Sequence, residues 1–235
     1  MLYDDLQMPS RGKNLHERSG PVGPDCARPP ISRRKTRWRM AKRSLKPDPA
    51  GTLMQLKVSL WDRPSIWRRL LVPADIKLPK LHTALQVSMG WTDSHLHRFH
   101  YEQMNYEPAF QLEEAWEPDE GQDEAKVRLV EVVNRVGDWL LYEYDFGDGW
   151  EHEVRVEKIV PAPSAGARRV ICLGGSRACP PEDCGGVYGY TRMLKIIANP
   201  KHREYAETRQ WLGGTFDPAA FAVAPINAAL LRLKP

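Results

Sequence analysis

Alternating hydrophobic and polar residues dominate the chain after its first 50 positions. The alternation over 54–60 predicts a half-buried strand, and the apolar run at 66–72 follows a short turn, which predicts its hairpin partner. A second hairpin is predicted at 140–146 and 150–156, because two alternating runs flank a Gly-Asp-Gly turn. A further strand is expected over 95–103. The sequence therefore predicts antiparallel strands joined by tight turns.

Helical spacing of apolar residues appears between and after these strands. Pro79 opens one predicted helix and Gly90 ends it, as is typical of helix termini. A shorter helix is predicted over 129–136, an irregular Gly/Pro/Cys stretch over 172–189, and only helices beyond it. Those final helices are expected at 190–198, at 201–212, after an Asp217-Pro218 cap, and at 226–233.

The order of these elements indicates the fold class. Strands come first and helices last, which favours an α+β protein over alternating βα units. We expect a mostly antiparallel sheet of hairpins packed with helices on one face, with a helical C-terminal third, in one domain spanning 51–235. An acidic stretch at 113–124 is predicted to be a solvated loop.

Charge divides the chain into two segments. The net charge is +4, yet residues 1–50 hold 12 Lys and Arg against 5 Asp and Glu, whereas the rest holds 22 against 25. The first segment has seven prolines and no periodicity, which predicts a disordered basic tail. A second interpretation is that residues 1–39 are upstream sequence and that the protein starts at Met40. Without a membrane-spanning run or a signal peptide, we expect a cytoplasmic protein.

Three cysteines fall within 13 residues of the Gly/Pro-rich stretch. Thiolates are soft ligands suited to zinc, and an inward-facing histidine would complete a tetrahedral set. The hypothesis is a zinc site of Cys172, Cys179, Cys184 and His152, with His97 as the other histidine that could complete it; the alternatives are buried free thiols or a disulfide between two of the three.

A second candidate site combines imidazoles and carboxylates. Such groups bind a cation or transfer protons when they converge in one cleft at the end of a sheet. The candidate cleft residues are His95, His97, Asp145, Asp148, His152, Glu182 and Asp183. The Gly-Asp-Gly turn explains part of this pattern without any function, because such residues are good turn formers.

Several ordered motifs resemble one protein family. The chain from 52 to 233 is similar to the plasmid pRiA4b ORF-3-like family, which is also labelled as a TnpR-like passenger protein of insertion elements. The motifs that carry the resemblance are Ile66-Trp67-Arg68-Arg69, His95-Leu96-His97, Tyr144-Asp145-Phe146-Gly147-Asp148, and Ala178-Cys179-Pro180-Pro181-Glu182-Asp183-Cys184. The resemblance implies an α+β domain found on mobile elements, and it implies no known activity.

Three functions are compatible with these patterns. The first is a non-catalytic binding or accessory module, associated with mobile elements, for an unidentified protein or small ligand. The second is a metal-dependent, zinc-type enzyme that uses the His/Asp/Cys cleft. The third is nucleic-acid binding through the basic tail at Arg33, Arg34, Lys35, Arg37 and Arg39, although the faintly acidic domain lacks a duplex binder's positive surface. The sequence contains neither a serine nor a tyrosine recombinase arrangement.

Overall fold

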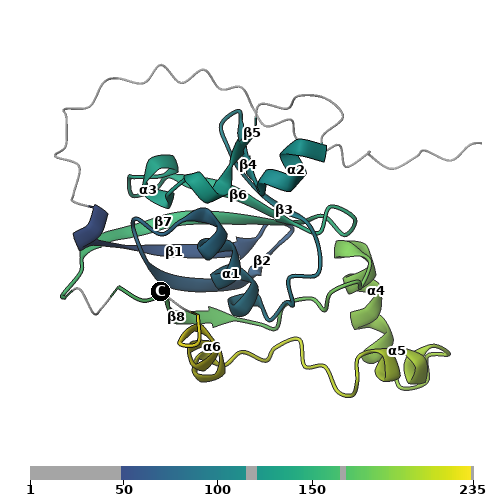
Figure 1. Ribbon diagram of the computed structural model, residues 1–235. Coiled ribbons are helices and arrows are strands. Elements are labelled where there is room, and N and C mark those ends of the chain that lie inside the picture. Colours follow the sequence, from purple (N-terminus) through teal and green to yellow (C-terminus); the bar gives the residue numbers. More distant parts are fainter. Residues whose placement is uncertain (1–48, 115–120, 165–167, 234–235) are drawn as a thin grey trace, which may run out of the picture. The chain divides into compact units, whose positions relative to one another are not determined.

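An eight-stranded sheet forms the centre of the computed structural model, which describes residues 49–114, 121–164 and 168–233 (Figure 1). The strand order is β5-β4-β3-β6-β7-β1-β2-β8, and every pairing except that of β4 with β5 is antiparallel. The strands are β1 (Thr52–Leu60), β2 (Arg63–Pro73), β3 (His97–Tyr101), β4 (Met104–Glu107), β5 (Gly121–Asp123), β6 (Trp139–Tyr144), β7 (Trp150–Pro161) and β8 (Ile171–Ser176).

The helices are mostly short and follow or interrupt the strands. They are α1 (Leu78–Met89), α2 (Ala109–Glu114), α3 (Leu129–Val132), α4 (Gly186–Ile197), α5 (Tyr205–Trp211) and α6 (Val223–Leu230), with single 3₁₀ turns at Pro49–Gly51 and Glu124–Lys126. The α+β class, the mostly antiparallel sheet and the helical C-terminal third are therefore confirmed. Among the described residues, every helix is too short or too polar to span a bilayer.

The core lies between one face of the sheet and α1. Alternate residues of β1, β6 and β7 point to this face, and the apolar stripe of α1 packs on it (Figure 1). The opposite face carries ion pairs such as Arg69 with Glu157 and Arg98 with Glu143. The sheet therefore has one buried face and one polar face, as its alternating sequence predicts.

The predicted strand over 95–103 was only partly right. β3 is shorter, because His95 precedes it and the chain turns at Glu102, whose φ is 56°. The strand β4 then pairs back on β3, and the sequence analysis did not predict it.

The prediction of an irregular stretch over 172–189 was wrong at both ends. It contains β8, an edge strand that is hard to recognise because two glycines interrupt it. The side chain of Asn227 accepts from the backbone N–H of Cys172 and donates to its carbonyl, which covers part of this edge. The helix α4 begins at Gly186 without a side-chain cap, so no capping signal marked it.

The remaining helix predictions were right in place and wrong in extent. The helix over 129–136 stops at Val132, α5 starts at Tyr205, and α6 runs from Val223 to Leu230. The Asp217-Pro218 pair makes a turn rather than a helix start, with Asp217 accepting from the N–H of Ala219. The acidic stretch 113–124 is not one solvated loop: α2 extends to Glu114, β5 begins at Gly121, and Glu124 is buried, whereas 115–120 lie outside the described residues.

Candidate functional site

His95, Asp145 and Asp183 come together at one end of the sheet. His95 precedes β3, Asp145 follows β6, and Asp183 lies in the loop before α4. Their ligand atoms all lie within 4.8 Å of one another, with His95 Nε2 3.1 Å from Asp183 Oδ1 and 3.7 Å from Asp145 Oδ2. We call these three residues the His95 cluster. It joins one imidazole and two carboxylates from distant parts of the sequence.

Local backbone geometry aims the two carboxylates. Asp145 and Asp183 both have a φ of 57°, in the left-handed region that aspartate tolerates better than most residues. The Oδ1 atom of Asp145 accepts from the N–H groups of Gly147 and Asp148, at 3.0 and 3.2 Å. Its other oxygen is the one that lies near His95. The turn after β6 therefore fixes this carboxylate before any ligand arrives.

Two further carboxylates belong to the same region. Asp148 Oδ2 accepts from the N–H of Gly185 at 3.2 Å. Glu182 accepts from the hydroxyl of Tyr144 at 2.5 Å and from the N–H and hydroxyl of Thr92 at 3.0 and 2.6 Å. Burial, with the bonded Glu182 carboxylate, raises the pKa of Tyr144 well above its ordinary value, so its hydroxyl donates.

A close backbone approach holds the two loops together. A Cβ atom at Gly186 would lie 2.5 Å from the carbonyl oxygen of Asp148, and the φ of Gly186 is 63°. Only glycine permits this contact without strain. The loop that carries Asp183 is thereby held against the turn that carries Asp145.

The charge of this region is strongly negative. Among the described residues, no Lys or Arg forms an ion pair with Asp145, Asp148, Glu182 or Asp183. The Cys184 thiol lies near three of these carboxylates. Its pKa is raised to about 12, mainly by burial and then by the negative charges of Asp148, Asp183 and Asp145. An uncompensated group of carboxylates around one imidazole is suited to a cation.

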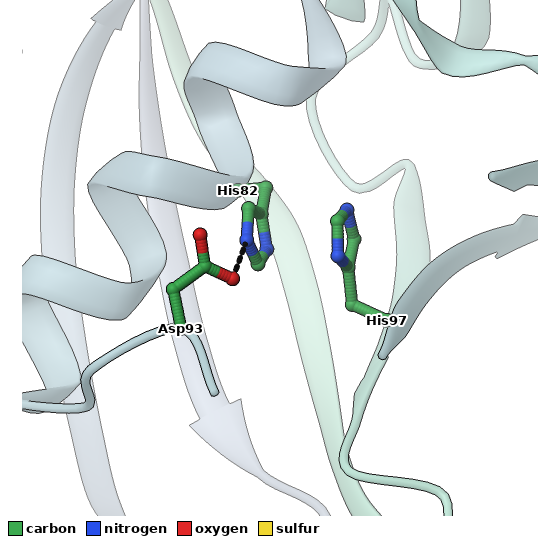
Figure 2. Close-up of side chains that lie close together, drawn as sticks. All are labelled: His82, Asp93 and His97. Atoms are coloured by element: carbon green, nitrogen blue, oxygen red, sulfur yellow. Dashed lines mark hydrogen bonds and ion pairs between the residues drawn. The ribbon is translucent and has the colours of Figure 1, made fainter. Parts of the chain in front are cut away.

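A second group of titratable residues centres on two buried histidines. Figure 2 shows His82 from α1 lying face to face with His97 from β3, and Asp93 on the far side of His82. The two imidazole rings are 3.5 Å apart and inclined by 6°. His82 Nε2 lies 2.7 Å from Asp93 Oδ1, and His97 Nε2 lies 3.1 Å from Glu124 Oε2. We call these four residues the His82 cluster.

The polar atoms of the His82 cluster are satisfied within the protein. Gln86 donates to the hydroxyl of Tyr142, which lies 2.8 Å from Nδ1 of His82. This network assigns the His82 proton to Nε2, facing Asp93, so that Nδ1 accepts from Tyr142. Burial, and then the neighbouring His97, lowers the pKa of His82 to about 4.

The ring geometry of this pair disfavours a metal ion. A metal-bound imidazole directs its nitrogen lone pair along the ring plane, and two parallel planes 3.5 Å apart cannot both contain one ion. Three ligand atoms of His82, Asp93 and His97 do lie within 4.8 Å of one another. Their proximity therefore reflects stacking and hydrogen bonding.

The structure separates the predicted cleft residues. His95, Asp145, Asp148, Glu182 and Asp183 lie in the region of the His95 cluster, whereas His97 belongs to the His82 cluster. His152 is fully buried, with Nδ1 3.2 Å from the carbonyl of Tyr142, and burial lowers its pKa to about 4.

The predicted zinc ligands do not gather. Cys172 lies beside Gly174, whereas the Cys179 sulfur lies 3.2 Å from the Arg68 guanidinium and 3.0 Å from the Met89 sulfur. Among the described residues, neither group of three ligand atoms within 4.8 Å contains a cysteine or His152. The three cysteines are free thiols, and burial raises the pKa of Cys179 to about 11. The basic residues Arg33, Arg34, Lys35, Arg37 and Arg39 lie outside the described residues.

Sequence reasoning did not include His82, Asp93, Tyr144 or Glu124 among the site residues. His82 falls on the apolar stripe of α1, where an ordinary core histidine is also expected. Asp93 and Glu124 lie in loops, and only the tertiary fold brings them to the two histidines. For these four residues, the one sequence signal of a place near the site was that Tyr144 stands directly before the candidate residue Asp145.

The fold and the His95 cluster define an α+β protein with a carboxylate-rich surface site at the end of an antiparallel sheet. The family model of plasmid pRiA4b ORF-3-like proteins matches residues 52–224, and the chain belongs to this family. The chain is 37% identical over 183 residues to the uncharacterized protein y4hQ of Sinorhizobium fredii, which covers 77% of this chain and 91% of that protein. Its fold is similar to the crystal structure of MM3350, a protein of unknown function from Methanosarcina mazei Go1, with a TM-score of 0.66, 37% identity, and coverage of 74% of this chain and 97% of that one.

Proposed function

We propose that the protein is a binding module whose binding site contains a divalent cation held by His95, Asp145 and Asp183. The observation that carries this proposal is the convergence of their three ligand atoms within 4.8 Å, in a region where no Lys or Arg of the described residues forms an ion pair with the carboxylates. The ion would neutralise charge that the protein leaves uncompensated. A bound ligand, either a small molecule or a side chain of a partner protein, would complete its coordination.

The ligand chemistry narrows the choice of ion. An imidazole nitrogen with two carboxylate oxygens suits Zn²⁺ or Mn²⁺, and it lacks the thiolates of a structural zinc site. Three protein ligands leave further coordination positions open, as in sites that bind water or substrate. Asp148 and Glu182 lie beside the three ligands and are held by Gly185 and Tyr144, so they would orient groups around the ion.

A metal-dependent hydrolase is the second candidate. It is favoured by Glu182, a carboxylate fixed by Tyr144 and Thr92 next to the His95 cluster, where a general base would be needed. In this alternative, His95, Asp145 and Asp183 would hold the ion, and Glu182 would serve as the general base for a water molecule that the ion activates. The family label connects either function with mobile genetic elements, and that association is part of the proposal.

Isothermal titration of the full chain with Zn²⁺ and Mn²⁺ tests the proposal. We expect one-to-one binding that weakens about 100-fold in His95→Gln and in Asp183→Asn, because each variant replaces a good ligand with a weakly coordinating neutral amide. The matched controls His100→Gln and Asp62→Asn should bind as the wild type does, because His100 lies in β3 on the polar face and Asp62 in the turn after β1.

Two results would reject the cation site. One is the absence of stoichiometric binding by a folded wild-type chain, and the other is equal affinity in the ligand variants and their controls. The hydrolase is separated from the binding module with a chromogenic phosphodiester. Cation-dependent turnover that disappears in Glu182→Gln would favour the enzyme, whereas binding without turnover would favour the module.

A further inference from the structure

A cavity of about 730 Å³ lies in a part of the domain that contains no residue of the His95 cluster. The end of β2, the start of α1, the segment 168–170 and the end of α6 line it. A cavity of this size is in the range of roughly 300–1,000 Å³ that is typical of small-molecule sites. None of its lining residues takes part in the proposed cation site.

Positive charge dominates the lining. Lys77, Lys80, Arg168 and Arg169 face Asp75 as the single acidic residue. Asp75 is bonded to Arg168, and among the described residues Lys80 and Arg169 form no ion pair. The cavity therefore carries more positive charge than its own side chains balance.

Two details add to the positive character of the lining. Arg168 is paired with Asp75 through its Nη2 atom, but its buried Nε atom has no hydrogen-bond partner among the described residues. The first turn of α1, where the helix dipole is positive, contains lysine and no acidic residue. An anion at this position would interact favourably with both features.

The rest of the lining is apolar. Ile76 and Leu230 are buried, Val170 is half-buried, and Leu231 is 65% exposed despite being a large aliphatic residue. An exposed leucine beside the basic lining residues favours a ligand with an aliphatic part next to an anionic part.

We infer that this cavity binds a single-chain anionic amphiphile, with a carboxylate head at the Lys80 and Arg169 side and an alkyl chain along Val170, Leu230 and Leu231. Charge complementarity selects the head group, because four of the five ionisable lining residues are basic. The volume selects a small ligand rather than a folded partner. This inference is independent of the cation site, since the two share no residue.

Calorimetric titration of the full chain with decanoate, below its micelle concentration, tests the inference. We expect saturable one-to-one binding, and binding at least about 10-fold weaker for acetate, which lacks the chain, and for decyltrimethylammonium, which has the opposite charge. Arg169→Glu and Leu231→Asp should each weaken decanoate binding by about 10-fold or more, because both side chains are exposed at the cavity. Lys201→Glu, a charge reversal at an exposed turn outside the cavity, should leave it unchanged.

Each other outcome overturns the inference. Failure of decanoate to saturate, equal binding of the cationic amphiphile, or unchanged affinity in both cavity variants would exclude the proposed ligand. Binding of a Leu- and Glu-rich peptide without binding of decanoate would also overturn it, in favour of a protein partner. Thermal unfolding of each variant verifies that the titrated protein is folded.

Discussion

The His95 cluster and the His82 cluster contain the same kinds of side chain in opposite surroundings. In the His82 cluster, His82 and His97 are buried, their rings are stacked, and each has a carboxylate within hydrogen-bond distance. In the His95 cluster, the imidazole is only half-buried, and its Nε2 atom faces two carboxylates without forming a hydrogen bond; each cluster has one exposed aspartate, Asp183 here and Asp93 there.

This difference shows why proximity of histidine and carboxylate does not by itself define a metal site. In the core, the donors and acceptors satisfy one another and burial keeps His82 neutral, so the group stabilises the fold. At the surface, carboxylates outnumber the available positive charge, so the group remains open to an ion. The comparison favours a structural role for the His82 cluster and supports the proposed binding role of the His95 cluster.

Lowering the pH should destabilise the folded protein mainly through its buried histidines. The pKa values of His82 and His152 are lowered to about 4, whereas unfolded histidine titrates near 6.5. The unfolded state therefore binds protons first, and stability is full above about pH 6.5 and falls as the pH is lowered toward 4. Urea unfolding at pH 7.5 and 4.5 should show a loss of about 2.5 kcal/mol attributable to His152 alone.

The variant His152→Phe separates this effect from general acid unfolding. It keeps an aromatic ring against Trp91 and Tyr142, and it removes the titrating group and its unpaired Nε2. The loss between pH 7.5 and 4.5 should shrink in His152→Phe and persist in the control His100→Phe. An unchanged loss in His152→Phe would mean that burial of this imidazole does not control acid stability.

Carboxylate-to-amide substitutions should change the free energy of unfolding with opposite signs in the His82 cluster and beside the His95 cluster. Glu124→Gln weakens a buried bond to His97 and should lower the free energy of unfolding by about 2 kcal/mol. Asp148→Asn removes a charge without a cationic partner among the described residues and keeps an acceptor for Gly185. In cation-free buffer it should raise the free energy of unfolding by about 0.5–1 kcal/mol. Urea unfolding of both variants measures the contrast, and stabilisation by Glu124→Gln or destabilisation by Asp148→Asn would contradict it.

Strong local patterns made much of the fold predictable. β1, β2, β6 and β7 follow from alternation and tight turns, and α1 follows from Pro79 and Gly90. β4, β5 and β8 were missed because their stability comes from pairing with neighbours rather than from their own sequences. Gly175 of β8 illustrates this, because it allows the ring of Phe221 to approach where a Cβ atom would lie 2.4 Å from it.

The candidate site was predictable as a set of residues but not as an arrangement. Five of the seven cleft residues lie in the region of the His95 cluster, because turns at strand ends place polar groups together. His152 and His97 alternate correctly onto the apolar face, and that placement buries them away from the surface. The cysteines are near one another in sequence, yet β8, a buried loop and the start of α4 direct them to different neighbours.

The location of a bound ion tests the central claim most directly. Crystals of the full chain grown with Zn²⁺ and measured at the zinc absorption edge would show the ion by its anomalous scattering. We expect a peak about 2.0–2.2 Å from His95 Nε2 and from one oxygen each of Asp145 and Asp183. A peak at His82 and His97 or among the cysteines, with none at the His95 cluster, would contradict the account.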